Sequence, residues 1–576
     1  MNRFDFPQTL PPSKPLLPAF TEHFSGWHLG MGLPNTLLGL LPTLFQLARR
    51  DPDCKDTTQG MSIWGTQAHP LTPGMGTWGI KSLNMGLKLG PAFTRVLLIT
   101  AKLPKLGEAA SETGDDAESK AELEAMDTWY ALARQDDRKL ILRFLTVVLS
   151  DSTKGLSWLH HVWDDLIHMG KPEIPKAALD MIEWTDATAP LKERMEADWA
   201  FHCLPPEKAL PIIEELDPAL WGLWRAYAGG ELLLRMGKKG EAKGILAGLW
   251  KAIPWHVNLT LKLYDLFKIP PIGESEDTKD VTILVYSWNK ADLLADTLHS
   301  LLESDIGHAK VIALNNGSSD HTDDMLLKAQ EAFGADRFRI ETLPVNVGAP
   351  AARNWLLALP EVKASKWAAF LDDDIVLPKD WLMRLLGPVK NRDDIGAVGC
   401  RITAAVPPYG LQSADYNLFP IPPADPKADM VPNRVLVFDN CAGTLDTGLF
   451  TYTRTCLSVS GCCHMVNMRS IEEAGGFDLR YTPSQFDDLD RDIRSSLIGM
   501  PALFVGGLAI RHIQHSSLAQ SKDVRQIGQV MGNKLKLDTK FTDEELIRLG
   551  EENQQRSWRD LKEKSTFLVD RLGMST

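Results

Sequence analysis

The stretch WAAFLDDD, residues 367–374, joins an apolar run to three consecutive carboxylates. A short apolar run of this kind predicts a buried strand, which places Asp372, Asp373 and Asp374 at its carboxyl end. Three adjacent carboxylates repel one another unless a cation lies among them, and oxygen ligands suit Mg²⁺ or Mn²⁺. The alternative is a solvated acidic turn or a helix cap ahead of Pro378, and the triplet by itself leaves both interpretations open.

The segments leading up to this triplet alternate between strands and helices. Runs rich in β-branched and apolar residues predict strands at VTILVYS (281–287), KVIALN (310–315), FRIETL (338–343) and WAAFLD (367–372). One face of the helix after the first strand carries Leu294, Leu298, Leu301 and Leu302. Strand–helix units of about 30 residues predict βαβ connections and a parallel sheet, whose ligands bind beyond the carboxyl ends of the strands. The polar motifs of this chain fall at those ends.

The first part of the chain has helical spacing and few strand alternations, which predicts an all-α N-terminal domain over residues 1–270. Residues 195–255 resemble tetratricopeptide-type helical hairpins. Small residues at Gly230 and Ala242 would let two antiparallel helices approach closely, and Ala209 precedes Ala242 by about 33 residues, close to the period of that repeat. The alternative is an ordinary helical bundle.

The length and composition of the chain indicate the number of domains and where they begin and end. A chain of 576 residues is long enough for two to four domains. The Pro-, Gly- and charge-containing segment 271–280 predicts a linker into an α/β domain over residues 281–520. A charged helical extension is predicted over residues 521–576.

The charge and cysteine content exclude several classes of protein. A formal net charge of −13 disfavours a nucleic-acid partner, which needs clustered Lys and Arg. The seven cysteines are odd in number and lack a CxxC pair, so neither a structural zinc site nor a full disulfide set is expected. This predicts a reducing, cytoplasmic setting.

The N-terminal sequence lacks the basic-then-apolar order of a signal peptide. The charge-free stretch 25–48 is interrupted by Pro34 and Pro42, and its apolar run is too short for a membrane span. It predicts a buried helix or a helix lying on a membrane surface. Peripheral association with the inner face of a membrane is the alternative to a purely cytoplasmic location.

Five motifs in a fixed order resemble those of the inverting glycosyltransferases of family 2, which use nucleotide sugars and have the GT-A fold, a Rossmann-like mixed sheet with flanking helices. The resemblance covers roughly residues 280–520. The motifs are VTILVYSWNKADLLADTLHSLL (281–302), ALNNGSSDHTDDML (313–326), LPVNVGAPAARNWLL (343–357), FLDDDIVLPKDWL (370–382) and GCCHMVNMRSIEEAGGFD (461–478).

The resemblance implies a metal site, occupied by Mn²⁺ or Mg²⁺. Asp372 and Asp374 match the DxD pair of the family, with Asp374 as a direct ligand and Asp372 in contact with the ribose or the metal. His512 and His515 follow the terminal strand whose histidine completes the metal shell in the family. The resemblance does not decide between these two histidines.

The resemblance also implies a catalytic site. The run QFDDLD, residues 485–490, is similar to the acidic-pair motif of the family, with Asp487 in place of the usual glutamate. Asp488 is implied as the general base that takes the proton of the acceptor hydroxyl, with Asp487 next in line. The alternative is that these acids only stabilise a helix N-terminus through its macrodipole.

The remaining candidates concern the donor. By resemblance the nucleotide-sugar contacts are implied for Tyr286, Asn315, Asn316, Asp320, Arg353, Asp372 and Asp373. Asn315 departs from the family, which usually has an acidic residue there, so the nucleobase stays open. An intradomain ion pair is the alternative role of Arg353. Residues 462–464 are expected to form the small, apolar floor of the acceptor pocket rather than a site.

These observations predict a metal-dependent inverting glycosyltransferase that moves a sugar from a nucleotide diphosphate donor to an acceptor hydroxyl. The acceptor would be a protein, a lipid-linked glycan or a surface polysaccharide, and the helical domain would bind the acceptor or a protein partner. A nucleotidyltransferase on a similar sheet is one alternative, although the segment YSWNKAD lacks the Gly-rich basic loop that it would need. A non-catalytic glycan- or protein-binding scaffold is the other, and the set of Asp372, Asp374 and Asp488 argues against it.

Overall fold

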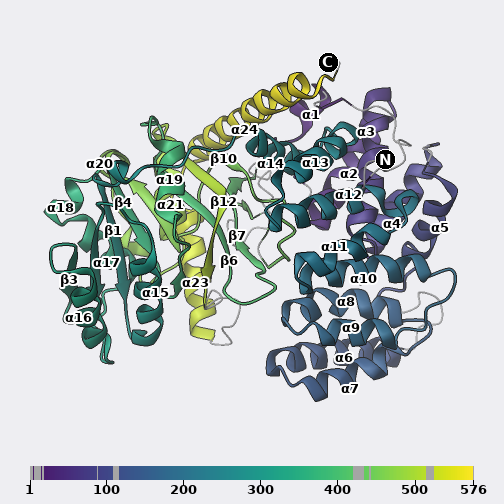
Figure 1. The fold of residues 1–576 in the computed structure, drawn as a ribbon, viewed down its shortest axis with the longest axis horizontal. Coiled ribbons are helices and arrows are strands. Elements are labelled where there is room, and N and C mark those ends of the chain that lie inside the picture. The colour runs from purple at the N-terminus through teal and green to yellow at the C-terminus, as the bar shows by residue number, and fades with distance from the viewer. Residues whose placement is uncertain are drawn as a thin grey trace. The chain divides into compact units, whose positions relative to one another are not determined.

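The computed structural model describes residues 18–574, except for 31, 87–88, 108–115, 420–433, 440, 442 and 514–523, together with residues 4, 14 and 15. The chain forms two compact units, both drawn in Figure 1. Unit 1 comprises residues 1–263, 445–448 and 564–576, and unit 2 comprises residues 264–444 and 449–563. Each unit is therefore built from separate stretches of the sequence.

The regular structure of unit 1 is helical in the part that the structure describes. Several helices begin with proline, whose fixed φ suits the first helical position and whose missing N–H would have no partner there. Asp51 and Asp217 cap two of them by accepting the N–H groups of Asp53 and Ala219. The helices are α1 (Pro18–His23), α2 (Pro34–Ala48), α3 (Pro52–Ala68), α4 (Pro73–Asn84), α5 (Pro91–Thr100), α6 (Asp116–Gln135), α7 (Arg138–Leu149), α8 (Gly155–His168), α9 (Glu173–Met181), α10 (Ala189–Cys203), α11 (Pro206–Glu215), α12 (Pro218–Arg235), α13 (Lys239–Ala252) and α14 (Val257–Phe267).

The helices α12 and α13 form a hairpin within the segment for which repeats are predicted. Gly237, with φ +75°, lies in the turn between them. A Cβ on Gly230 would lie 2.8 Å from Leu246 Cδ2, so the helices approach too closely for a larger residue there. Close packing of one hairpin occurs in repeats and in bundles alike, and the tetratricopeptide assignment stays a prediction.

The segment 445–448 belongs to unit 1 although its sequence neighbours belong to unit 2. Its carbonyl groups accept hydrogen bonds from three side chains of unit 1: Tyr227 to Thr447 (2.7 Å), Arg235 to Asp446 (3.0 Å) and Lys262 to Gly448 (2.7 Å). Lys262 also forms a buried ion pair with Glu231 at 2.6 Å. These contacts hold the segment by its backbone.

In the described residues, no helix is both long enough and apolar enough to span a membrane. The charge-free stretch 25–48 contains α2, which is packed into unit 1. Its leucines at 37, 40, 41 and 44 are at most 2% exposed.

A ten-stranded mixed sheet forms the centre of unit 2. Its order is β10-β12-β6-β11-β4-β1-β2-β3, with β5 beside β12 and β7 beside β6, and a separate ribbon pairs β8 with β9. The strands are β1 (Val281–Ser287), β2 (Lys310–Asn315), β3 (Phe338–Thr342), β4 (Trp367–Leu371), β5 (Ile375–Val376), β6 (Ala397–Ala404), β7 (Leu411–Ser413), β8 (Tyr416–Leu418), β9 (Val437–Asp439), β10 (Thr453–Cys456), β11 (Cys463–Asn467) and β12 (Ala502–His512).

The four strands predicted from the sequence are the parallel strands β1 to β4, and their ends agree to within one residue. The strand β11 pairs antiparallel with both β4 and β6, which makes the whole sheet mixed. The α/β fold class with an all-α N-terminal part is confirmed. All residues of β4 are buried, as expected of a central strand covered by helices on both faces.

The helices and short turns of unit 2 precede, connect and follow the strands, and the last of them, α24, ends in unit 1. They are η1 (Ser275–Thr278), α15 (Ala291–Glu303), α16 (Thr322–Phe333), α17 (Ala349–Leu357), α18 (Pro360–Lys363), α19 (Trp381–Leu386), η2 (Gly387–Val389), α20 (Met468–Ala474), η3 (Leu479–Tyr481), α21 (Asp487–Leu497), α23 (Val524–Asp538) and α24 (Asp543–Leu572). Leucines of α15 and of α19 pack against the strands in the main core. A second core joins α21 to α23 and α24 through Tyr481, Ile493, Leu537, Phe541 and Leu549.

Candidate active site

The acidic triplet follows β4 directly, and its carboxylates have different partners. Asp373 accepts a hydrogen bond from the hydroxyl of Ser287, at the end of the neighbouring β1, at 2.7 Å. Asp374 lies 2.9 Å from His512 Nε2. The Lys290 ammonium bridges the two carboxylates, 3.2 Å from Asp373 and 2.9 Å from Asp374. Asp373 and Asp374 are 8% and 3% exposed, which excludes the solvated acidic turn.

Strand pairing brings His512 to this site. His512, the last residue of β12, pairs with Ile375 of β5, the residue that follows Asp374. The Gln412 Oε1 atom lies 2.7 Å from His512 Nδ1 and fixes the orientation of the ring, as partners of metal-binding histidines do. His515, the other histidine implied by the resemblance, lies outside the described residues.

Burial and neighbouring charges distinguish the three carboxyl groups. Burial raises the pKa of Asp373 to about 6, and it also raises the pKa of Asp372. Burial acts in the same direction on Asp374, but the hydrogen bond from His512 and the charge of Lys290 outweigh it and lower the pKa of Asp374. Asp374 is therefore held as a carboxylate, the form that binds a cation.

Three donor atoms of different chemistry meet beside the triplet. One ligand atom each from Asp372, Cys462 and His512 lies within 4.8 Å of the other two. A carboxylate, a thiol and an imidazole each bind divalent transition-metal ions, so this set fits such an ion, and the thiol favours softer ions than Mg²⁺.

Cys462 is a candidate ligand that sequence reasoning missed. The sequence places it in an apolar pocket floor, whereas the pairing of β11 with β4 sets Cys463 opposite Leu371 and brings Cys462 beside Asp372. The backbone N–H of Asp372 donates to the Cys462 carbonyl at 3.0 Å. The sequence carried no signal for this contact, because it depends on the register of two distant strands. Lys290 was also missed, although it directly precedes the first helix of the domain.

A second acidic pair lies at the start of α21. Asp487 forms a buried ion pair with Arg353, whose Nη1 lies 3.0 Å from its carboxylate. Burial raises the pKa of Asp487 to about 6, while the Arg353 charge opposes that rise. The Asp488 carboxylate accepts the N–H of Gly461 at 2.9 Å. The two neighbouring acids thus have separate partners.

The segment 461–462 connects the two acidic groups. Gly461 contacts Asp488, and the next residue, Cys462, contacts Asp372. A Cβ on Gly461 would lie 2.7 Å from Asp488 Oδ2 and 3.1 Å from Arg353 Nη2, so a larger residue there would displace the side chains of the site. Asp372, Cys462 and His512 on one side therefore meet Asp487, Asp488 and Arg353 on the other.

Arg353 lies at the centre of this second group. Its guanidinium faces the rings of Tyr286, Phe370 and Phe477, with 5.5, 5.7 and 4.9 Å to the ring centroids. Its Nε is buried and has no hydrogen-bond partner among the described residues. The ion pair that the sequence left as an alternative is thus present, and one further donor of the same guanidinium remains available for an anion.

The other donor candidates lie at the ends of β1 and β2 and hold the loops there. Asn315 donates to Asp323 at 2.6 Å and accepts the N–H of Ser318. Asn316 donates to Asn346 at 3.0 Å. Asp320 accepts the N–H groups of Ala291 and Thr322, the first residues of α15 and α16, and so joins the starts of the two helices. In these contacts the three residues hold the loops in place. Their contacts with a nucleotide stay a prediction.

The fold and the site together define a class of protein. Carboxylates, an imidazole and an arginine lie at the carboxyl ends of parallel strands, the edge at which α/β proteins bind their ligands. Within that class, residues 282–445 match the model of Glycosyl transferase family 2. The resemblance found in the sequence is confirmed for this region of the chain.

Two relatives illustrate the match. The chain is 33% identical over 106 residues to the teichuronic acid biosynthesis glycosyltransferase TuaG of Bacillus subtilis (strain 168), which covers 18% of this chain and 40% of TuaG. It is 27% identical over 135 residues to the poly-beta-1,6-N-acetyl-D-glucosamine synthase of Staphylococcus aureus (strain MSSA476). This match covers 23% of this chain and 31% of the synthase. The chain thus spans less than half the length of these curated relatives.

Solved structures give distant matches. GalNAc-T7 with UDP, GalNAc and Mn²⁺ is 11% identical, covers 52% of this chain and 57% of its own, and has a TM-score of 0.34. The mannosyltransferase PcManGT from Pyrobaculum calidifontis, in complex with GDP-Man and Mn²⁺, is 15% identical and has a TM-score of 0.32. The match covers 61% of this chain and 85% of PcManGT.

Proposed function

We propose that the protein is a metal-dependent inverting glycosyltransferase that uses a nucleotide diphosphate sugar. The observation that carries this proposal is the meeting of Asp372, Cys462 and His512 with Asp487 and Asp488 through the segment 461–462, in a chain of which one region matches the family 2 model. A metal-binding group beside a candidate base is what a single-displacement transfer requires.

The reaction needs stabilisation of the leaving group. The bond between the anomeric carbon and the diphosphate oxygen breaks, and the nucleoside diphosphate departs with added negative charge. A divalent cation held by Asp374, Asp372, His512 and Cys462 would neutralise that charge. Arg353 supports the same task, because its buried guanidinium has a donor, Nε, without a hydrogen-bond partner in the part of the chain that the structure describes.

The reaction also needs a base. The acceptor hydroxyl oxygen attacks the anomeric carbon from the face opposite the diphosphate, and its proton passes to Asp488. The Gly461 N–H donates to one carboxylate oxygen of Asp488 and the Leu489 N–H donates to the other, so both oxygens are oriented and each keeps a lone pair for the acceptor proton. Asp487 is held by Arg353 and keeps the guanidinium at the site.

We infer that the acceptor is a glycan. The relatives above are named for teichuronic acid biosynthesis and for the synthesis of poly-beta-1,6-N-acetyl-D-glucosamine, and both products are glycans. The helical unit 1 would then bind the acceptor or a protein partner.

A panel of UDP- and GDP-sugars tests the proposal. The whole chain is incubated with each donor and Mn²⁺, with and without glycan acceptors, and nucleoside diphosphate release is measured. We expect release from at least one donor, its loss on chelation, and a product with inverted anomeric configuration. An absence of binding and release for every donor would show a non-catalytic scaffold instead.

A further inference from the structure

The turn that precedes the candidate base has an unusual backbone. Gln485 and Phe486 have φ values of 85° and 69°, and Asp487 and Asp488 follow immediately. Residues with a Cβ rarely adopt this left-handed region, and two in succession persist only when the surrounding structure holds them there. The position of Asp488 therefore depends on whatever holds this turn.

Asn533 of α23 holds the turn directly. Its side-chain amide donates to the carbonyls of Tyr481 at 3.0 Å, Ser484 at 2.9 Å and Gln485 at 3.5 Å. The Asn533 side chain is fully buried. One side chain of the C-terminal extension thus binds the backbone of the turn at several points.

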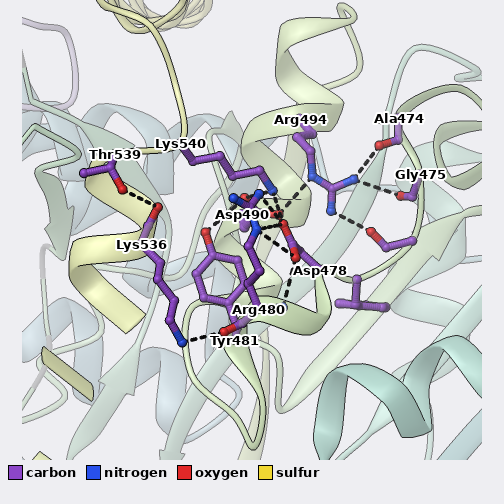
Figure 2. Close-up of polar contacts among 12 residues, drawn as sticks. Ala474, Gly475, Asp478, Arg480, Tyr481, Asp490, Arg494, Lys536, Thr539 and Lys540 are labelled. Carbon is purple, nitrogen blue, oxygen red and sulfur yellow. Dashed lines mark hydrogen bonds and ion pairs between the residues drawn. The ribbon is translucent and has the colours of Figure 1, made fainter. Parts of the chain in front are cut away.

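Lys540, two residues after the end of α23, holds the helix that carries the proposed base. Its ammonium lies 2.6 Å from Asp490 of α21 and 2.7 Å from Asp478. Asp490 is fully buried and also pairs with Arg494 at 2.9 Å, while Arg494 donates to the carbonyls of Ala474 and Gly475 (Figure 2). Figure 2 also shows Lys536 donating to the Arg480 carbonyl, at 2.7 Å. Lys540 therefore meets acids of α21 and of the preceding turn, and Lys536 binds the backbone of that turn.

The part of the extension that carries Asn533 and Lys540 is itself firmly attached within unit 2. Leu537 and Phe541 pack in one core with Tyr481 and Ile493. Asp538 is 1% exposed and accepts the N–H of Val435 at 2.8 Å. A residue can hold a catalytic side chain in place only if packing and hydrogen bonds hold that residue itself in place. The buried contacts of Leu537, Asp538 and Phe541 do this for the segment that carries Asn533 and Lys540.

We propose that Asn533 and Lys540 are positioning residues, through which the C-terminal extension holds Asp488 in the geometry for proton transfer. The inference rests on the proposed function of Asp488. Neither residue touches substrate in this account, since both act through the turn 481–486 and through Asp490. The extension would then be part of the catalytic apparatus, although it lies beyond the residues that match the family model.

The competing explanation is that these contacts only stabilise the fold. A purely structural role predicts a lower melting temperature with little change in kcat of the folded fraction. A positioning role predicts a lower kcat with unchanged donor KM, because donor binding depends on residues outside the turn.

The test compares two buried asparagines of the extension. Asn533→Ala removes the contacts with the turn, and Asn553→Ala removes a contact with Asn417 (3.4 Å) elsewhere in unit 2. We expect Asn533→Ala to lower kcat roughly 10- to 100-fold with donor KM changed by less than about twofold, and Asn553→Ala to leave both near wild type. Lys540→Met should act like Asn533→Ala, and Lys540→Arg should recover most of the rate. An equal effect of the two Asn→Ala variants, or a change in KM alone, overturns the proposal.

Hydrogen exchange separates this inference from the proposed function and covers variants that fold poorly. We expect the amides of residues 482–488 to exchange faster in Asn533→Ala and in Lys540→Met than in Asn553→Ala. Unchanged exchange there contradicts the positioning role even if the wild type transfers sugar. If the two variants exchange faster but the wild type uses no donor, the support of the turn is established and the proposed function of Asp488 is contradicted.

Discussion

Asp487 and Asp488 are adjacent in sequence and differ in their partners, and this difference assigns their roles. Arg353 neutralises Asp487, whereas Asp488 accepts only backbone N–H groups, those of Gly461 and Leu489, in the described part of the chain. The direct ion pair occupies Asp487 with Arg353, and Asp488 stays the residue that we propose as the base.

Replacing Asp488 by Asn should separate binding from transfer. Asn keeps the size and can still accept the Gly461 N–H, but it cannot take the proton. We expect transfer to fall by roughly 10²-fold or more, with donor affinity unchanged. Steady-state kinetics and donor titration measure the two quantities. Near-normal transfer would contradict the assignment and point to Asp487.

The thiol of Cys462 should be visible as a metal ligand. With Co²⁺ as the probe, a bound thiolate gives a sulfur-to-cobalt charge-transfer band in the near ultraviolet. We expect this band in the wild type and its loss in Cys462→Ser. Cys203→Ser, a half-buried cysteine of unit 1, is the control and should keep it. Bound Co²⁺ without the band in the wild type would remove Cys462 from the site.

At the scale of elements, the turn 474–482 is joined to α21 and α23 by charge. Asp478 pairs with Arg480 and with Lys540, both at 2.7 Å. Burial works against its ionisation, but these partners prevail, so the pKa of Asp478 lies well below its usual value. Such a carboxyl stabilises the fold above its unfolded pKa of about 3.9, and this stabilisation is lost as pH falls through the lower, folded pKa.

The loss of folding stability at low pH should therefore depend on Asp478. We expect the free energy of unfolding to fall below about pH 4 more steeply in the wild type than in Asp478→Asn. Denaturant unfolding at several pH values measures this. Asp292→Asn, an exposed acid of α15, is the control and should keep the wild-type slope. Equal slopes for wild type and Asp478→Asn would contradict the role of the ion pairs.

The sequence predicted the elements of unit 2 better than their contacts. The runs 281–287, 310–315 and 367–372 are short, apolar and β-branched, and a strand is the only element that fits them between helices. The acids Asp374 and Asp488 could be named because the order of motifs resembles a known family. Cys462, Asn533 and Lys540 could not, since their contacts depend on strand register and on helix packing between distant segments.

At the scale of the whole molecule, the chain passes between its two units more than once. Residues 445–448 and 564–576 belong to unit 1, while the sequence between them belongs to unit 2. Unit 2 is therefore not one continuous stretch of the sequence. The range 281–520 stays a prediction for the domain itself.

A fragment of residues 264–576 would expose this arrangement. It lacks Tyr227, Arg235 and Lys262, whose side chains hold the carbonyls of residues 446–448 in the whole chain. We expect limited proteolysis to cleave the fragment within 445–448 much faster than the whole chain. Cleavage of the segment 271–280 serves as the reference in both. Equal protection of 445–448 would contradict its assignment to unit 1.

Binding of a nucleoside diphosphate tests the central claim most directly. Calorimetric titration of the whole chain with UDP and with GDP, with and without Mn²⁺, compares the wild type with Asp374→Ala. The exposed Asp380→Ala serves as the control. The account predicts that Mn²⁺ strengthens binding of at least one nucleotide in the wild type and in Asp380→Ala, and has no effect in Asp374→Ala. The same Mn²⁺ effect in Asp374→Ala as in the wild type would contradict it.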